Sequence, residues 1–244
     1  MSISYRQEQI LSILRERNYI TVNELATVLF TSPSSIRRDL TAMQNNGLVT
    51  RSHGGVCLPV TTEGVAGFYD RMRKNTQEKR KIAQKAATLI KSGQKILLDS
   101  SSTSMFLLPH IARVKNTSIF TNNLFTASKS IELGIDTHCL GGHALAGSTT
   151  LSGAETYRAI AALRPDILFF SSQSLDVDGV ISDSTEEEIL VRLMMCDAAK
   201  TSVFLCDSTK FGTRSLYTLG NLSDADFAVF DEPFEELQTN CQLL

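Results

Sequence analysis

The hydrophobic pattern of the chain changes near Gly93, and this change constrains the fold more than any other feature. Before it, apolar residues recur at helical spacing; after it, short apolar runs alternate with helical stretches. The run Ile167-Leu168-Phe169-Phe170 is apolar on both faces, as in a central parallel strand covered by helices. The alternation predicts an α/β fold with a mainly parallel sheet. We expect its strands at residues 95–98, 118–121, 137–140, 166–171, 202–206 and 227–230.

The N-terminal part instead predicts three short helices followed by a hairpin. Thr21 and Glu24 have the spacing of a capping box at the start of the second helix. Ser32 as N-cap and Pro33 at the first helical position begin the third helix. Two β-favouring stretches around a glycine pair predict a hairpin over residues 48–58. This order of elements is typical of a winged helix-turn-helix.

The third predicted helix carries polar residues beside its apolar face, and in this motif it lies in the major groove of DNA. Serine hydroxyls and a helix N-terminus can hold phosphate, and arginine can make a two-pronged contact with guanine. Asp39 would repel phosphate, so we expect it to pair with an arginine or cap a neighbouring element. A solvated helix face is the alternative for the two arginines taken alone. The predicted contacts to a double-stranded DNA operator are Ser34, Ser35, Arg37 and Arg38 on the helix and Arg51 and His53 on the wing.

Charge is distributed unevenly along the chain. Residues 1–91 hold 14 Lys and Arg against 7 Asp and Glu, whereas residues 92–244 hold 10 against 19. A basic N-terminal part is typical of a domain that faces a polyanion. The predicted organisation is a DNA-binding domain at 1–58, a linker and hinge helix at 59–92, and an effector-binding domain at 93–244.

Several sequence motifs carry a resemblance to the DeoR family of bacterial regulators over nearly the whole chain. The N-terminal ones are Arg6-x-x-x-Ile10, Ile36-Arg37-Arg38-Asp39-Leu40 and His53-Gly54-Gly55. The resemblance implies an operator binder, usually a repressor of carbohydrate catabolism genes, that works as a homodimer or homotetramer. It also implies a sensor domain similar in fold to ribose-5-phosphate isomerase, with a phosphorylated sugar as effector.

The same resemblance implies where the effector binds. The loop at Asp99 follows a strand and precedes a helix, where backbone N–H groups and hydroxyls can cradle a phosphate. In open α/β sheets, ligands bind beyond the carboxyl ends of the strands, and the loop at Asp99 and the other segments named below follow strands in this way. Ser101 and Ser102 replace the Gly-Thr usual in the family, which leaves the identity of the effector open. The predicted effector contacts are Asp99, Ser100, Ser101, Ser102, Thr103, Thr121, Asn122, Asn123, Gly141, Gly142, Glu186 and Lys210.

Two other functions are weighed against this one. A sugar-phosphate isomerase with a nucleic-acid tether is the enzyme alternative, but the D-G-A-D and K-G-G-G strings of such isomerases do not occur in the sequence. A transcriptional activator is the second alternative. We expect neither a metal nor a cofactor, since the spacing of His138, Cys139 and His143 matches no common zinc signature. Without a long apolar run, an N-terminal signal or a C-x-x-C pair, the chain is expected to be cytoplasmic and to bind no membrane.

Overall fold

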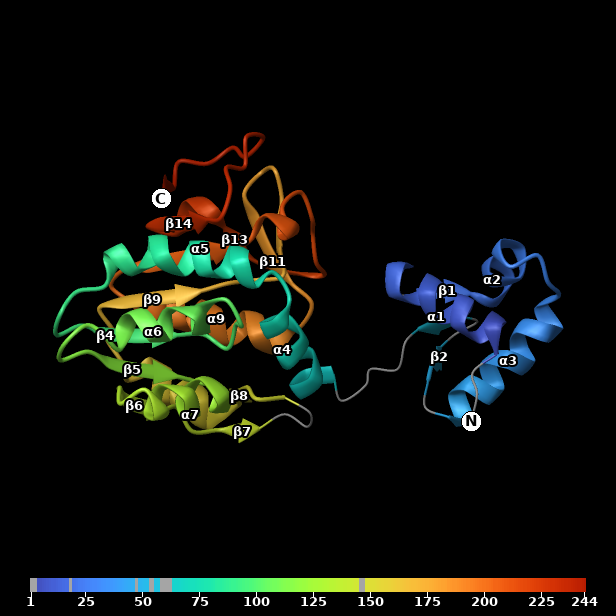
Figure 1. The fold of residues 1–244 in the computed structure, drawn as a ribbon, viewed down its shortest axis with the longest axis horizontal. Coiled ribbons are helices and arrows are strands. Elements are labelled where there is room, and N and C mark those ends of the chain that lie inside the picture. The colour runs from blue at the N-terminus through green and yellow to red at the C-terminus, as the bar shows by residue number, and fades with distance from the viewer. Residues whose placement is uncertain (1–3, 18, 47, 53–54, 58–62, 145–147) are drawn as a thin grey trace. The chain divides into compact units, whose positions relative to one another are not determined.

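The computed structural model describes residues 4–17, 19–46, 48–52, 55–57, 63–144 and 148–244. The chain forms two compact units, Met1–Glu63 and Gly64–Leu244 (Figure 1). Each unit has its own hydrophobic core. Among the described residues, no helix is long and apolar enough to cross a membrane.

The first unit combines three helices with a three-stranded antiparallel sheet in the order β1-β3-β2. The three predicted helices and the predicted hairpin are confirmed. The third strand, β1, was not predicted, because three residues are too few to show a period. In chain order the elements are α1 (Tyr5–Arg17), β1 (Tyr19–Thr21), α2 (Val22–Val28), α3 (Pro33–Asn45), β2 (Thr50–Ser52) and β3 (Gly55–Cys57).

Local capping fixes where the second and third helices begin. Thr21 Oγ1 accepts a hydrogen bond from the Glu24 backbone at 3.2 Å, and the Glu24 carboxylate accepts one from the Thr21 backbone at 2.8 Å. Ser32 Oγ accepts from the Ser35 backbone at 3.2 Å, with Pro33 in the first turn. With its start fixed in this way, α3 turns three apolar side chains into the core, namely Ile36, Leu40 and Met43.

The second unit is built on a seven-stranded sheet in the order β15-β14-β12-β9-β4-β5-β6, in which every pair of neighbours is parallel. The predicted parallel α/β fold is therefore confirmed, and each expected strand is found within one residue of its expected ends. The short seventh strand at the C-terminus was not predicted. The strands are β4 (Lys95–Leu98), β5 (Ser118–Thr121), β6 (Asp136–Cys139), β9 (Ile167–Phe170), β12 (Ser202–Cys206), β14 (Phe227–Phe230) and β15 (Gln242–Leu243).

Helices cover both faces of this sheet, which gives three layers (Figure 1). Successive strand residues point to opposite faces, so Ile96 and Leu98 enter one core while Leu97 enters the other. The central strands are buried on both sides, as their apolar runs predict. The helices are α4 (Glu63–Arg73), α5 (Thr76–Ala86), α6 (Leu108–Ile111) and α7 (Leu124–Glu132) on the first face and α8 (Ala154–Ala161) and α9 (Glu186–Ala198) on the second.

The helices expected to form a linker and hinge belong to the second unit. Phe68 of α4 and Ile82 of α5 are fully buried in its core. We predicted a linker at 59–92, but the compact unit already begins at Gly64. The apolar stripe of α5 needs a surface to cover it, and the sheet supplies that surface. Within the predicted linker, residues 59–62 lie outside the described residues.

Two small antiparallel sheets and a broken helix border the carboxyl edge of the main sheet. A 3-10 turn ends at Leu107 and α6 begins at Leu108, so the helical segment breaks next to Pro109, as expected for a proline, which is tolerated in the first turn of a helix. The small sheets are formed by β7 (His143–Ala144) with β8 (Leu151–Ser152) and by β10 (Ser174–Leu175), β11 (Val180–Asp183) and β13 (Tyr217–Asn221).

Candidate functional site

The first turns of α3 present an exposed basic surface. Arg37 and Arg38 are both exposed, and their side chains have no hydrogen-bond partner among the described residues. Ser34 and Ser35 sit at the helix start, where their hydroxyls bond to the Ser32 hydroxyl at 2.9 and 3.0 Å. Four of the six predicted DNA contacts therefore gather on one helix N-terminus.

Asp39 does not oppose this basic surface. It forms an ion pair with Arg6 of α1, which confirms the expected arginine partner. That ion pair places the negative charge against α1 and joins the two helices. On the predicted wing, Arg51 lies in β2, of which only the backbone is described here, and His53 lies outside the described residues.

A polar pocket lies at the carboxyl ends of the central strands of the second unit. Its lining comes from the loops after β4 and β9, from α4 and α9, from the end of β11 and from the turn after β12. Ligands bind at this edge in open α/β sheets. The lining residues are Arg71, Ser100, Ser101, Ser102, Thr103, Ser171, Ser172, Gln173, Asp183, Glu188, Arg192 and Lys210.

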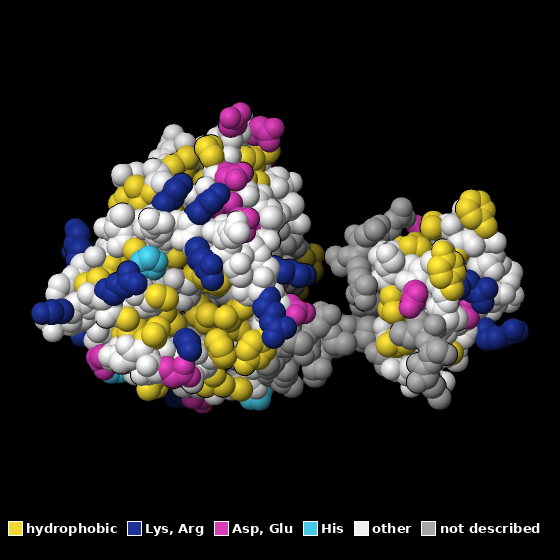
Figure 2. Space-filling model, in the orientation of Figure 1, with side chains coloured by type: hydrophobic (Ala, Val, Ile, Leu, Met, Phe, Trp, Pro, Cys, Tyr) yellow, Lys and Arg dark blue, Asp and Glu magenta, His cyan; other side chains and the backbone are white. Residues whose placement is uncertain are grey.

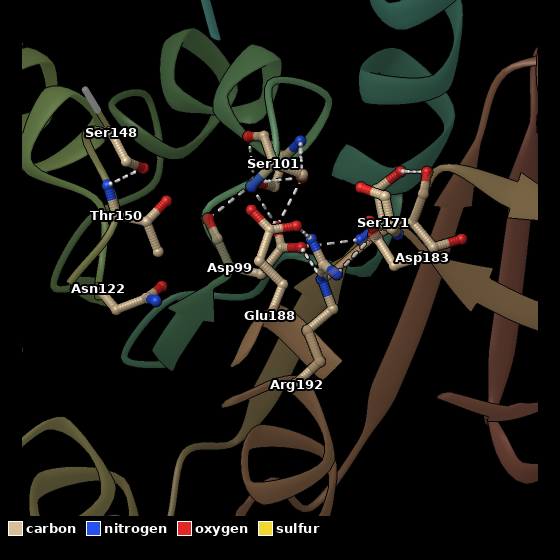
Figure 3. Close-up of polar contacts among 12 residues, drawn as sticks. Asp99, Ser101, Asn122, Ser148, Thr150, Ser171, Asp183, Glu188 and Arg192 are labelled. Atoms are coloured by element: carbon tan, nitrogen blue, oxygen red, sulfur yellow. Dashed lines mark hydrogen bonds and ion pairs between the residues drawn. The ribbon is translucent and has the colours of Figure 1, made fainter. Parts of the chain in front are cut away.

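Arg192 of α9 organises the floor of the pocket and is only 4% exposed. Its guanidinium donates to Asp99 at 3.1 Å, to Asp183 at 2.7 Å and to Glu188 at 3.3 Å (Figure 3). Burial lowers the pKa of Arg192, but the carboxylates of Glu188, Asp183 and Asp99 outweigh burial and hold it above its ordinary value. Because these three carboxylates already occupy the guanidinium, Arg192 positions the other groups of the site.

Asp99 ties the loop after β4 to the loop after β9. Its Oδ1 accepts hydrogen bonds from the Ser101 backbone at 3.1 Å and the Ser101 hydroxyl at 2.5 Å, and its Oδ2 accepts from the Ser171 backbone at 3.1 Å. The serine that replaces the family's usual glycine thus fastens this loop. Since Asp99 is buried and both its oxygens are used within the protein, it shapes the pocket wall from behind.

Lys210 and Arg71 are the two cations that the pocket can offer to a ligand, and Lys210 lies beside the loop after β9. Its Nζ donates to the Ser171 hydroxyl at 3.1 Å and lies 3.3 Å from Asp207 Oδ2. Among the described residues, Lys210 is the partner of that oxygen, and the two form an ion pair. Burial raises the pKa of Asp207, but the charge of Lys210 and the hydrogen bond from Thr209 lower it by more. The net pKa is therefore below the ordinary value, and Asp207 is ionised.

The loop after β4 offers free donors beside Lys210. The hydroxyls of Ser100, Ser102 and Thr103 have no hydrogen-bond partner among the described residues, nor do the backbone N–H groups of Ser102 and Thr103. The free volume of the pocket is about 50 Å³. A water needs roughly 10–15 Å³, so the pocket has room for a group of phosphate size.

Besides Asp99, six further predicted effector contacts do not line this pocket. Thr121, Asn122 and Asn123 are fully buried. Asn123 caps α7 through the Thr126 backbone at 2.9 Å, and Asn122 donates to the Leu151 carbonyl at 3.0 Å. They hold the segment before β8 against the sheet. The other three, which lie elsewhere on the second unit, are Gly141, Gly142 and Glu186.

At Gly142 the backbone lies too close to neighbouring atoms to leave room for a side chain. Gly142 has φ of 142°, and an added Cβ would lie 2.1 Å from Thr156 Oγ1 and 2.7 Å from the Ser152 carbonyl. Thr156 Oγ1 donates to the Gly141 carbonyl at 2.6 Å. Gly142 therefore lets the chain pass close to α8. Glu186 is exposed at the start of α9, two residues before the glutamate that does line the pocket.

Seven lining residues were absent from the predicted set. A signal existed for Glu188 and Arg192, because charges four residues apart stand out in the apolar run of α9. A signal also existed for Ser171, Ser172 and Gln173, because they directly follow an apolar strand, where ligands bind in parallel sheets. No local signal places Arg71 or Asp183 at the pocket, since elements distant in sequence bring them there. The seven are Arg71, Ser171, Ser172, Gln173, Asp183, Glu188 and Arg192.

Two polar clusters outside the pocket, around Asp176 and around His138, have structural roles. Asp176 accepts hydrogen bonds from the backbones of Asp178 and Val180, both at 2.9 Å, and pairs with Arg214, so it holds a turn. His138 stacks on Phe120 with ring centres 4.5 Å apart. Within the described ranges, no group of three His, Cys, Asp or Glu side chains is arranged to bind a metal ion.

Comparison with known proteins agrees with a DNA-binding regulator that carries a sensor domain. Residues 6–62 match the DeoR-like helix-turn-helix domain, and residues 74–232 match the DeoR C terminal sensor domain. The second match alone covers more than half of the chain. The chain belongs to the DeoR family of DNA-binding transcriptional regulators.

Curated relatives match along almost their whole length. The HTH-type transcriptional regulator GolR of Listeria innocua is 32% identical, over 93% of this chain and 89% of that protein. The HTH-type transcriptional repressor GlcR of Bacillus subtilis is 28% identical, over 93% and 89%. The glycerol-3-phosphate regulon repressor of Escherichia coli is 26% identical, over 96% and 92%. All three are named as regulators and none as an enzyme.

Solved structures resemble the second unit only distantly. Ribose 5-phosphate isomerase A from Methanocaldococcus jannaschii is 15% identical with a TM-score of 0.43, over 57% of this chain and 55% of that one. A translation initiation factor eIF-2B from Pyrococcus horikoshii is 16% identical with a TM-score of 0.49, over 68% of each chain. These likenesses are too weak to bear on function.

Proposed function

We propose that the chain is a repressor whose hold on its operator is changed by a small phosphorylated effector bound at the polar pocket. The observation that carries this proposal is the pairing of one partly exposed cation, Lys210, with free hydroxyls and N–H groups in a pocket of phosphate size. Among the relatives, GlcR and the Escherichia coli protein are named repressors, and the latter is named for glycerol 3-phosphate. Operator DNA would place the protein in the cytoplasm.

The ligand's phosphate would lie against the loop after β4. Ser100, Ser102 and Thr103 would donate hydroxyl hydrogen bonds, and Lys210 and Arg71 would supply charge. Carboxylates hold Arg192, so the net charge offered to an anion comes from the other two cations. The carbon skeleton would extend out of the pocket, whose free volume of about 50 Å³ would be filled by the phosphate.

Thermal unfolding of the full chain with a panel of pentose, hexose and glycerol phosphates tests this proposal. A ligand that binds only the folded state raises the melting temperature by mass action. Lys210→Met should weaken binding of the active panel member by roughly tenfold or more, since a hydrogen bond to a charged group is worth about 1.5–3 kcal/mol. Lys200→Met, a surface lysine outside the pocket, is the control. If Lys210→Met binds as well as the wild type, the pocket is not the effector site.

DNA binding by this class of protein also calls for more than one copy. Winged helices of such regulators occupy paired half-sites, so we propose a homodimer or homotetramer. Apolar side chains gather over α4, α6 and α7 on the face drawn in Figure 2, where Tyr69, Ile131 and Leu133 are exposed. Such a patch suits contact with a second copy. Sedimentation of the wild type and Ile131→Glu should show the variant shifted to a smaller species.

A further inference from the structure

The turn between α4 and α5 is fastened to the pocket through one asparagine side chain. Asn75 has φ of 52° and donates its amide to Asp207 at 3.0 Å and to Thr209 at 2.8 Å. Asp207 lies 3.3 Å from Lys210, which lines the pocket. Lys210 is thus connected to the turn at the end of α4 through two contacts, one with Asp207 and one between Asp207 and Asn75.

A buried lysine fastens the same turn from the other side. Lys79 of α5 is 3% exposed, and its Nζ donates to the carbonyls of Arg71 and, at 2.9 Å, of Lys74. These carbonyls belong to the C-terminal end of α4, where a helix has unpaired acceptors and a negative dipole. Both its hydrogen bonds hold the end of α4, and no carboxylate forms an ion pair with Lys79 among the described residues.

The helix held in this way also enters the pocket and leads to the DNA-binding unit. Arg71 of α4 lines the pocket, and Phe68 of the same helix is buried in the core. In sequence, α4 is the first element after the winged helix. A change at the end of α4 therefore reaches the connection to the DNA-binding unit without crossing any other element.

We propose that Asn75 and Lys79 form a relay that transmits occupancy of the pocket to α4, a regulation that rests on the proposed effector site. An anion on Lys210 competes with Asp207 for the lysine's charge. Asp207 is then free to accept more strongly from Asn75, and the repulsion between Lys210 and Lys79 falls. Both changes tighten the turn between α4 and α5. Asn75 and Lys79 are positioning residues in this scheme, since neither lines the pocket.

Substitution of Asn75 by glycine isolates the relay from the binding site. Glycine adopts positive φ without strain, so Asn75→Gly removes the amide and keeps the backbone conformation. Asn116→Gly is the matched control, because Asn116 also has positive φ, 60°, and is exposed far from the turn in sequence. Asn75→Asp is a second variant, of nearly the same shape, that places a negative charge against Asp207.

The experiment uses the full chain with inorganic phosphate as probe. Binding is followed by thermal shift, α4 by hydrogen exchange of residues 64–73, and DNA affinity by titration of a duplex that the wild type selects from a random library. In the wild type and Asn116→Gly, phosphate should slow exchange in α4 and weaken DNA binding, each on the order of fivefold or more. In Asn75→Gly and Asn75→Asp, phosphate should still bind within about threefold of wild type, while both responses fall below about twofold.

The possible outcomes distinguish failure of the relay from failure of the proposed effector site. Normal phosphate binding with intact responses in both Asn75 variants would overturn the relay and leave the proposed function standing. A wild type whose melting temperature phosphate does not change, or one in which Lys210→Met binds phosphate normally, would overturn the proposed function and the relay with it. Loss of phosphate binding in both Asn75 variants would also reject the relay, because it would place Asn75 in the binding site.

Discussion

The two units carry their polar functional groups in opposite ways. In the first unit, Arg37 and Arg38 stand exposed on one helix, without side-chain partners in the described part of the chain. In the second, Arg192 is buried and joined to carboxylates from three different segments. An exposed side chain can contact DNA without giving up any interaction that stabilises the fold. A buried ion-pair network, in contrast, is itself part of the folded structure. Substitution of the exposed arginines should therefore change DNA affinity without changing the stability of the first unit. Substitution within the buried network should change the stability of the second unit together with its pocket.

The largest expected effect comes from breaking the buried network. Arg192→Met leaves Asp99 and Asp183 buried without their cation, which should cost about 3–5 kcal/mol of unfolding free energy. Urea unfolding of the full chain measures this, and the loss should fall in the transition of the second unit. Arg158→Met, which removes an exposed arginine from α8, should change the same quantity by no more than about 0.5 kcal/mol. Equal effects of the two variants would contradict the assigned role of Arg192.

Removing the exposed arginines should do the reverse. Arg37→Ala with Arg38→Ala is expected to weaken operator binding by at least about a hundredfold, since each DNA contact is worth about 1–3 kcal/mol. The melting temperature should stay within error of wild type, because neither side chain has a partner to lose. Gel shift and thermal unfolding give the two quantities. Arg113→Ala with Lys115→Ala, an exposed pair on the second unit, should leave DNA binding unchanged; full DNA binding by the Arg37 and Arg38 variant would refute the proposed surface.

Lys79 makes stability depend on pH in a direction that can be checked. Burial, with the nearby charge of Lys210, lowers the pKa of Lys79 to about 8, against 10.5 for a free lysine. Between these values the unfolded chain binds more protons, so stability rises with pH across that window and the gain is absent below pH 8. From pH 8 to 9.5 the wild type should gain about 2 kcal/mol relative to Lys79→Met in urea unfolding. If the unfolding free energies of the two proteins change with pH in the same way, the pKa of Lys79 is not lowered in the folded protein.

The smallest effect concerns the local signal that begins α3. Ser32→Ala removes the N-cap and should destabilise the first unit by about 1 kcal/mol. Ser12→Ala, at an exposed position inside α1, should be neutral or slightly stabilising, because alanine is the better helix former there. Thermal unfolding compares the two. A Ser32 variant as stable as the Ser12 variant would show that the core alone fixes where α3 begins.

Much of the first unit could be predicted from its sequence because its signals are local. A capping box at Thr21, an N-cap at Ser32 and the spacing of Ile36, Leu40 and Met43 each involve residues within about two helical turns. Even the partner of Asp39 was anticipated by type, an arginine, although only the fold shows that it is Arg6. The parallel sheet was equally predictable, since a strand buried on both faces must be apolar throughout.

The tertiary structure alone decided which groups share the pocket. Asp99 and Arg192 are far apart in sequence and meet because the loop after β4 and helix α9 both lie at the carboxyl edge of the parallel sheet. It also decided that Asn122 and Asn123 are buried supports and that α4 and α5 belong to the sensor's core, not to a linker. A residue's chemistry is written in the sequence, whereas its burial and partners depend on chain segments that only the folded sheet brings together.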